Sequence, residues 1–455
     1  MPYRSIAGMV LVCALGLVSV SHAQMGGGMG GGMGGGMGGG MGGGMGNIPG
    51  AAFGGATDPG ALQIADGFRV IPSIMVGQRY DSNVLFAANG NNFRTRGLSK
   101  EDFVTTTIPQ VRGQYSGSLV TVDAMAGAVG EYYAKNTGLS YVGTRAGAAL
   151  DVSRLVSRLW EGTRLTVSDT YSYTPQPPAF LTGDLSGEGA NPFVRGFQVG
   201  RVNTQTNVFG TNLTAPLNQV VNLIGSYTNG FIKFGSSDVQ QVGQLLDTNY
   251  QTYMAGFSMN RSLQDTVSLN FVGAEYAYGD RGSFTMRGGT VGWTRLFTPN
   301  VSLVSTAGAQ LVETKFGVTP SSTSIAPLGN LALLWRDSTT TMTLAYGLGV
   351  TPSLQFQSAT LRTHVVSFNL VQQTTIPDLL GVVGLNFGHG DRIGSGSTGF
   401  SYVSWGGTGG LTYRLTPQTF LGLTYSYLNN NQSFGGQSFL IERQIVQLSL
   451  TQAFY

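Results

Sequence analysis

Charged residues, cysteine and histidine are all scarce in this chain. Lysine, arginine, aspartate and glutamate make up only 10% of its 455 residues, whereas about 25% is usual in soluble domains. The formal net charge of +3 is too small to indicate nucleic-acid binding. The single cysteine, Cys13, lies in the apolar leader described below, so we expect neither a disulfide nor thiol chemistry in the mature protein.

Long apolar runs are absent beyond that leader. No stretch of about 18 apolar residues follows residue 23, which excludes a transmembrane helix. Glycine and aromatic residues are abundant instead, with 70 glycines, 24 phenylalanines and 19 tyrosines. Low charge together with many small and aromatic residues suits a wall that faces lipid on one side and water on the other.

Residues 1–23 have the pattern of a secretory signal peptide. Arg4 supplies the positive start, Ile6–Val20 forms the apolar core, and Ser21-His22-Ala23 provides a small-x-small cleavage site. The alternative is a lipoprotein signal with Cys13 as the lipidated residue. That alternative fits less well, because Val12 occupies a position that requires a small residue.

Residues 24–67 are predicted to be a flexible periplasmic tether and linker. Met25–Gly46 repeats one methionine and several glycines, a composition that cannot form a core and maximises backbone entropy. The alternative is a thioether site for Cu(I), since methionine sulfur suits that ion. No histidine or cysteine of the tract supports the metal site, so the tether is preferred.

From residue 68 to residue 455 the chain shows a repeated period of two. In Thr341–Val350, TMTLAYGLGV, one phase is large and apolar and the other is small or polar. About ten residues is the length that a tilted strand needs to cross a membrane. Short connections such as Pro216–Gln219 alternate with long ones such as Pro175–Arg195, as in bacterial barrels with tight periplasmic turns.

These segments predict an all-β fold, a transmembrane antiparallel up-and-down β-barrel of about 18 strands, with 16 also plausible. An open sheet edge is not tolerated in lipid, so the first strand, Phe68–Phe86, should pair with the last, Ser438–Phe454. A soluble sandwich or propeller would bury both faces of many strands, yet the second face here is glycine, serine, threonine and asparagine. Phe454 and Tyr455 give the aromatic end by which the barrel assembly machinery would recognise the chain.

Charged residues on the phase opposite the apolar side chains are expected to line the lumen, because a charge facing lipid is costly. They form either a mutually neutralising network or a selectivity lining, and their mixed sign argues against strong ion selectivity. Tyr132, Tyr171, Tyr227 and Tyr425 are expected to form interfacial girdles rather than a sugar path. The lumen-lining candidates are Arg79, Asp81, Asp123, Glu131, Arg145, Asp151 and Arg443.

Nothing in the pattern points to an enzyme. A lipid hydrolase would need a histidine beside a serine, with a third group to orient the ring. His364 lies near a loop end on the lipid-facing phase of Val366 and Phe368, but no pattern links it to a serine. His389 opens the segment HGDRIGSGSTG, where we expect a surface loop. We therefore expect no catalytic residue, cofactor or metal site.

Two stretches resemble a known family. Pro72–Asn83, PSIMVGQRYDSN, and Glu101–Val111, EDFVTTTIPQV, are similar to the opening hairpin of outer-membrane barrels associated with exosortase/PEP-CTERM and exopolysaccharide loci, and to the wider β-barrel porin 2 group. Asp81-Ser82-Asn83 departs from the contiguous Asp-Asn of that family, and the methionine–glycine tract is foreign to it.

The resemblance implies an outer-membrane role near polysaccharide secretion and supplies no catalytic residues. Our expectation is an outer-membrane channel or conduit in a Gram-negative cell, with polysaccharide or secretion components as partners. The alternative is a non-conducting scaffold whose N-terminal tether engages a periplasmic partner. The longest connection, Pro175–Arg195, either folds into the mouth of the barrel or covers its outside.

Overall fold

The computed structural model describes residues 62–65, 67–85, 89, 98–176, 202–237, 246–316, 321–352, 360–393, 400–434 and 437–454. The predicted signal peptide, almost all of the predicted tether, most of the connection Pro175–Arg195, and Tyr455 lie outside these residues. One short piece of the predicted linker is a strand: Leu62–Ala65 forms β1, because Leu62 pairs with Val70 of the next strand.

Eighteen further strands follow β1, each of 11 to 17 residues. Their bounds are β2 (Phe68–Asp81), β3 (Asp102–Ser116), β4 (Thr121–Tyr133), β5 (Tyr141–Asp151), β6 (Arg164–Gln176), β7 (Val202–Pro216), β8 (Val221–Ser237), β9 (Thr248–Asn260), β10 (Asp265–Ala277), β11 (Gly282–Thr298), β12 (Val301–Phe316), β13 (Ser322–Arg336), β14 (Thr340–Pro352), β15 (Thr360–Gln373), β16 (Leu379–Ile393), β17 (Phe400–Thr416), β18 (Thr419–Phe434) and β19 (Gln437–Ala453).

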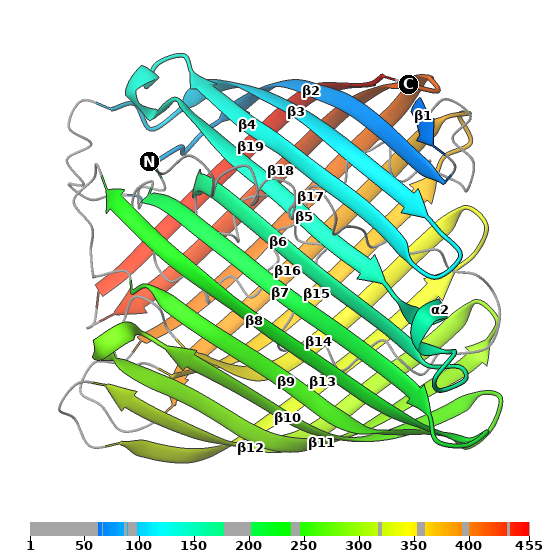
Figure 1. Cartoon of the computed structure of the whole chain (residues 1–455). Helices are drawn as coiled ribbons and strands as arrows, with labels where there is room; N and C mark the ends of the chain where they lie inside the picture. The colour runs from blue at the N-terminus through cyan, green and yellow to red at the C-terminus, as the bar shows by residue number, and fades with distance from the viewer. Residues whose placement is uncertain are drawn as a thin grey trace, which may run out of the picture.

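The sheet formed by these strands is closed. Every strand from β2 to β19 pairs antiparallel with the next one along the chain, and β19 pairs with β2 from Ile445↔Asp81 to Ala453↔Ser73. The result is an eighteen-stranded barrel with tilted strands (Figure 1). The prediction of an up-and-down barrel whose first and last strands pair is therefore confirmed.

The two faces of the wall differ as the period of two predicts. In β10, Leu269 is 62% exposed and Phe271 is 50% exposed, whereas Asn270 between them is 5% exposed. In β19 the alternation is the same: the apolar Leu448 is exposed, whereas Arg443 on the other phase is buried. We call the face with the exposed apolar side chains the outer face and the other the inner face. The predicted girdle residues Tyr132, Tyr171, Tyr227 and Tyr425 are all exposed with the apolar side chains of the outer face.

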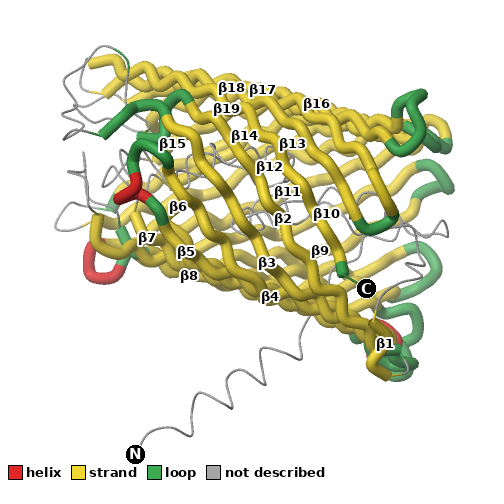
Figure 2. Tube along the Cα trace, turned by 90° about the horizontal axis from the view of Figure 1, so that it is seen from above, coloured by secondary structure: helices red, strands yellow, loops and turns green. Residues whose placement is uncertain are grey.

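The connections also differ between the two ends of the barrel. Turns such as Pro299–Asn300 between β11 and β12 are short, and we call this the turn end. The opposite ends of the strands, the loop end, carry the longer connections. The helical turn α2 (Ser153–Val156) lies at the turn end, and the single turns η2 (Thr137–Leu139) and η4 (Gly279–Arg281) lie at the loop end (Figure 2). No described helix is long and apolar enough to span a membrane.

The predicted strand ends are least accurate at the loop end. β2 stops at Asp81 rather than Phe86, because the Asp81 carboxylate accepts the N–H of Asn83 and turns the chain. β16 continues through His389 to Ile393, so the prediction that His389 lies in a loop is wrong. There β15 and β16 continue to pair beyond the predicted strand end, and their side chains Arg362 and Asp391 form an ion pair.

Candidate functional site

The inner face carries a buried ion pair at the seam where the barrel closes. Arg443 of β19 donates from its Nε to Asp81 Oδ1 of β2 at 2.8 Å, and its Nη2 donates to the other carboxylate oxygen. Asp81 is 0% exposed and Arg443 is 4% exposed. Because each charge is removed from water, each depends on the other for its stability.

The ion pair continues across the next strands. Arg79 Nε lies 3.8 Å from Asp81 Oδ2, and the other end of its guanidinium makes two hydrogen bonds to Glu131 of β4, at 2.9 and 3.0 Å. The Tyr133 hydroxyl donates to Glu131 at 2.8 Å. We call Arg79, Asp81, Glu131, Tyr133 and Arg443 the seam network. It brings together four of the seven lumen-lining candidates, and its charges largely satisfy one another.

A second ion pair lies on the same side of the barrel, toward the turn end. Arg112 Nε of β3 donates to Asp123 Oδ1 of β4 at 2.7 Å, and Gln114 Nε2 donates to Asp123 Oδ2 at 2.9 Å. Arg112 was not among the predicted candidates. The sequence did indicate that Arg112 faces inward. Arg112 shares a phase with the polar residues Gln110 and Gln114, and Val111 on the other phase is exposed.

Asp151 and Arg145 lie on the inner phase of β5 but have different surroundings. Asp151 is the last residue of β5, and its Oδ1 accepts the N–H of Ser153 at 2.8 Å, where α2 begins. Its contacts are therefore those of a turn residue at the barrel end.

Arg145 lies near the middle of β5 and makes no ion pair with a described carboxylate. Its direct neighbours in the sheet are Gly127 of β4 and Ser172 of β6, and the next strand contributes Thr206, whose hydroxyl lies 2.6 Å from that of Ser172. These neighbours are small or carry hydroxyl groups. Among the described contacts, Arg145 differs in this respect from Arg79 and Arg443, the other two arginines of the seven candidates, which both pair with carboxylates.

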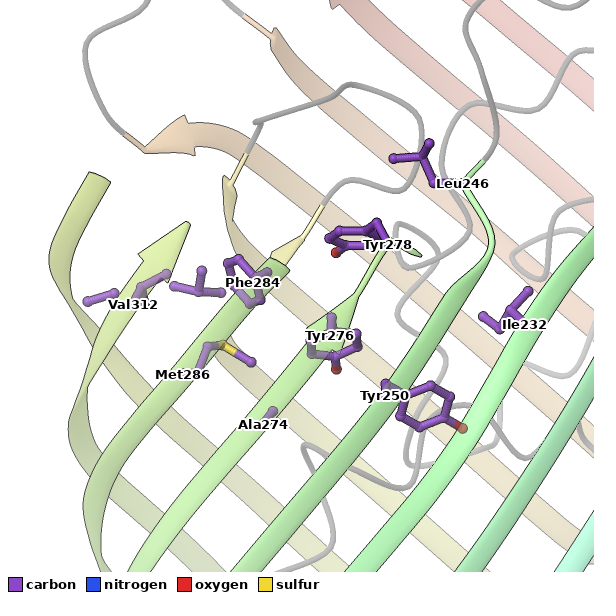
Figure 3. Close-up of a cluster of buried hydrophobic side chains, with 11 residues drawn as sticks. Ile232, Leu246, Tyr250, Ala274, Tyr276, Tyr278, Phe284, Met286 and Val312 are labelled. Carbon is purple, nitrogen blue, oxygen red and sulfur yellow. The ribbon is translucent and has the colours of Figure 1, made fainter. Parts of the chain in front are cut away.

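The opposite side of the inner wall is aromatic. Tyr250, Tyr276, Tyr278, Phe284 and Met286 form a buried cluster at the loop end of β9, β10 and β11 (Figure 3). The rings of Tyr250 and Tyr276 stack at 5.9 Å, and those of Tyr276 and Phe284 meet edge to face at 5.8 Å. Because β11 follows β2 by nine places in the closed order, the cluster faces the seam network across the barrel. At the loop end of the barrel, one side of the inner face thus carries ion pairs and the opposite side carries aromatic side chains.

The two histidines outside the predicted signal peptide lie on the outer face near the loop end. His364 of β15 and His389 of β16 are direct partners in the sheet. The hydrogen bonds of their Nδ1 atoms go to the Tyr346 hydroxyl and the Tyr402 carbonyl, respectively, so neither bond reaches a serine. Within the described ranges, no group of three histidine, cysteine, aspartate or glutamate side chains is arranged to hold a metal ion.

No family model matches this chain, and no curated protein matches it. Solved structures do resemble it. The crystal structure of OccK9 (OpdG) from Pseudomonas aeruginosa is 13% identical, with 85% of this chain and 98% of that chain covered and a TM-score of 0.44. OccK2 (OpdF) from the same organism, in complex with glucuronate, is 11% identical at the same coverage and TM-score. Acinetobacter baumannii OccAB3 is 12% identical, with 85% and 99% covered and a TM-score of 0.42.

Proposed function

We propose that this protein is a non-enzymatic channel of the Gram-negative outer membrane that passes small solutes through the barrel. A closed wall with an apolar outer face and a polar, charged inner face supports this proposal, because such a wall leaves no open sheet edge in lipid. Phe454, exposed on the same phase as Leu448 and Leu450, would present the C-terminal signal to the barrel assembly machinery.

The observation that carries the channel proposal is the positive charge of Arg145 at mid-strand, which no described carboxylate neutralises. Arg69 and Arg336, on the inner phases of β2 and β13 near the turn end, likewise make no ion pair with a described carboxylate. The acids of the seam network and Asp123 are paired with arginine, and the other two inner-phase acids of the described strands, Asp102 and Asp151, accept backbone N–H groups. The lumen therefore has a slight excess of available positive charge, which favours a weak preference for anions.

We expect the purified protein to conduct ions in planar bilayers with chloride slightly more permeant than potassium. Arg145→Gln should bring the ratio of chloride to potassium permeability, measured from the reversal potential in a salt gradient, close to that of an unselective pore. Lys315→Gln is the matched control, because Lys315 carries the same charge but is exposed on the outer face beside Glu313. It should leave the ratio unchanged.

An absence of conductance is informative only once the longest connection is removed. Deletion of residues 177–195 leaves β6 and the start of β7 intact. If neither the full chain nor this deletion variant conducts, the barrel is not an open channel. An equal shift in Arg145→Gln and Lys315→Gln would place the selectivity outside the lumen.

We further propose that the channel serves polysaccharide secretion. The support is the resemblance of Pro72–Asn83 and Glu101–Val111 to barrels of exopolysaccharide loci. In the structure these stretches belong to β2 and β3, and Asp81 and Asp102 are direct partners there. A host strain that lacks the gene should secrete less polysaccharide, measured as total sugar in the culture supernatant. Unchanged secretion would leave general solute passage as the role.

A further inference from the structure

Two histidines face each other on the outer wall of the barrel at the boundary between apolar and polar side chains. His364 and His389 are direct cross-strand partners, and their ring centroids lie 6.2 Å apart with an interplanar angle of 29°. The next pair toward the middle of the wall is Val366 with Phe387, both exposed and apolar. The next charged pair toward the loop end is Arg362 with Asp391, joined at 2.8 Å.

Each of the two rings is held by its Nδ1 atom. His389 Nδ1 lies 3.1 Å from the carbonyl oxygen of Tyr402. A carbonyl only accepts, so this Nδ1 carries the proton, and the lone pair of the neutral ring is on Nε2. His364 Nδ1 lies 2.9 Å from the Tyr346 hydroxyl, which can accept its proton in the same way. A histidine whose second nitrogen is fixed by a hydrogen bond is the usual arrangement at metal sites.

We propose that His364 and His389 bind one divalent transition-metal ion, of the copper(II), nickel or zinc class, through their Nε2 atoms. Imidazole is a preferred ligand of these ions, whereas calcium and magnesium require oxygen ligands. Two imidazoles that bind one ion at about 2.0–2.1 Å, at the ligand angles of a square-planar or tetrahedral site, have ring centres roughly 4.5 to 5.5 Å apart. The observed separation of 6.2 Å is larger, so both side chains must rotate toward each other for one ion to bridge them.

The surroundings of the pair permit a cation. Arg362 is the nearest charged side chain along β15, and its guanidinium is already neutralised by Asp391 through hydrogen bonds of 3.3 and 2.8 Å. No third protein ligand is present among the described residues, so water would complete the coordination. We expect a site of moderate affinity, accessible from the outer face of the barrel near its loop end.

Copper(II) binding to the tag-free, mature chain in detergent tests this site. Electron paramagnetic resonance should show one bound copper per chain with coupling to two nitrogen nuclei. His364→Gln and His389→Gln should each remove one nitrogen from the spectrum and weaken binding at least tenfold. Tyr346→Phe should weaken binding by roughly tenfold, because it removes the group that orients His364.

The design separates this site from the methionine–glycine tract. Thioether sulfur favours copper(I), so copper(II) under oxidising conditions reports on the imidazoles. Lys315→Gln, another outer-face substitution, serves as the control and should bind like the unaltered protein. The unaltered chain decides the question even if a variant misfolds, because a spectrum without two-nitrogen coupling overturns the proposal. Binding at undiminished affinity in either histidine variant, or a spectrum that still shows coupling to two nitrogen nuclei there, also overturns it.

Discussion

Arg443→Ala is expected to lower the free energy of unfolding of the barrel by about 3–5 kcal/mol, because it leaves a buried carboxylate without its main partner. Asp81 is fully buried and Arg443 nearly so. The loss falls at the seam between β19 and β2, the pairing on which closure of the whole barrel depends. Urea titration of the protein in detergent, followed by tryptophan fluorescence and by gel migration without heating, measures the change.

A double variant distinguishes loss of the charge pair from loss of packing. Replacing Arg443 with methionine and Asp81 with leucine removes both charges together, and such exchanges of a buried pair for apolar residues are often close to neutral. We expect the double variant to be more stable than Arg443→Ala. Lys315→Ala breaks an exposed ion pair on the outer face and should cost no more than about 1 kcal/mol. Equal losses in Arg443→Ala and Lys315→Ala would show that the seam pair has no special role.

The number and order of strands were predictable because lipid imposes a simple rule on each residue. A strand that crosses the membrane must alternate, and the segment Thr341–Val350 does so without interruption inside β14, Thr340–Pro352. Closure followed from the cost of an unpaired edge in lipid, which does not depend on any particular residue. Pairing of the first strand with the last was therefore predictable without knowing a single side-chain contact.

The ends of the strands at the loop end were harder to predict because they extend beyond the apolar band. The pattern around His389 turns polar and glycine-rich, yet β16 continues for four more residues to Ile393. At the end of β2 the opposite error arises: Val84 and Leu85 are apolar, but they belong to a turn and pack against Val104. Polarity no longer separates strand from loop where both faces of the sheet are wet.

The inner face was predictable residue by residue, but its pairings were not. The period of two alone placed Asp81 and Arg443 on the inner face. The partner of Arg79, in contrast, is Glu131 on β4, two strands away, and that pairing depends on the register between the strands. Arg112 shares its phase with the polar Gln110 and Gln114, but it was missed because the apolar Val104 and Ile108 also lie on that phase. The inner aromatic cluster was missed for a similar reason, since β10 carries Phe271 on one face and Tyr276 on the other.

Arginine substitutions on adjacent residues of β16 test whether the outer face meets lipid. Leu385 is 53% exposed on the outer face, and Asn386 lies on the inner face with Ser367 and Gly406 as its direct neighbours. In phospholipid vesicles Leu385→Arg should destabilise the barrel by about 2–4 kcal/mol, because the guanidinium would be held in the hydrocarbon layer. Asn386→Arg should cost much less, because the inner side chain does not meet the hydrocarbon layer.

Both variants add one positive charge to the same strand, so any general effect of charge on folding cancels in the comparison. Reversible unfolding in urea, measured separately in vesicles and in detergent micelles, gives the change in the free energy of unfolding for each variant relative to the unaltered protein. A thicker hydrocarbon layer should increase the loss for Leu385→Arg and leave Asn386→Arg unchanged, because only the outer side chain is held at a depth set by the lipid. Equal losses in vesicles would mean that the apolar face does not contact lipid, and the proposed membrane channel would then have to be abandoned.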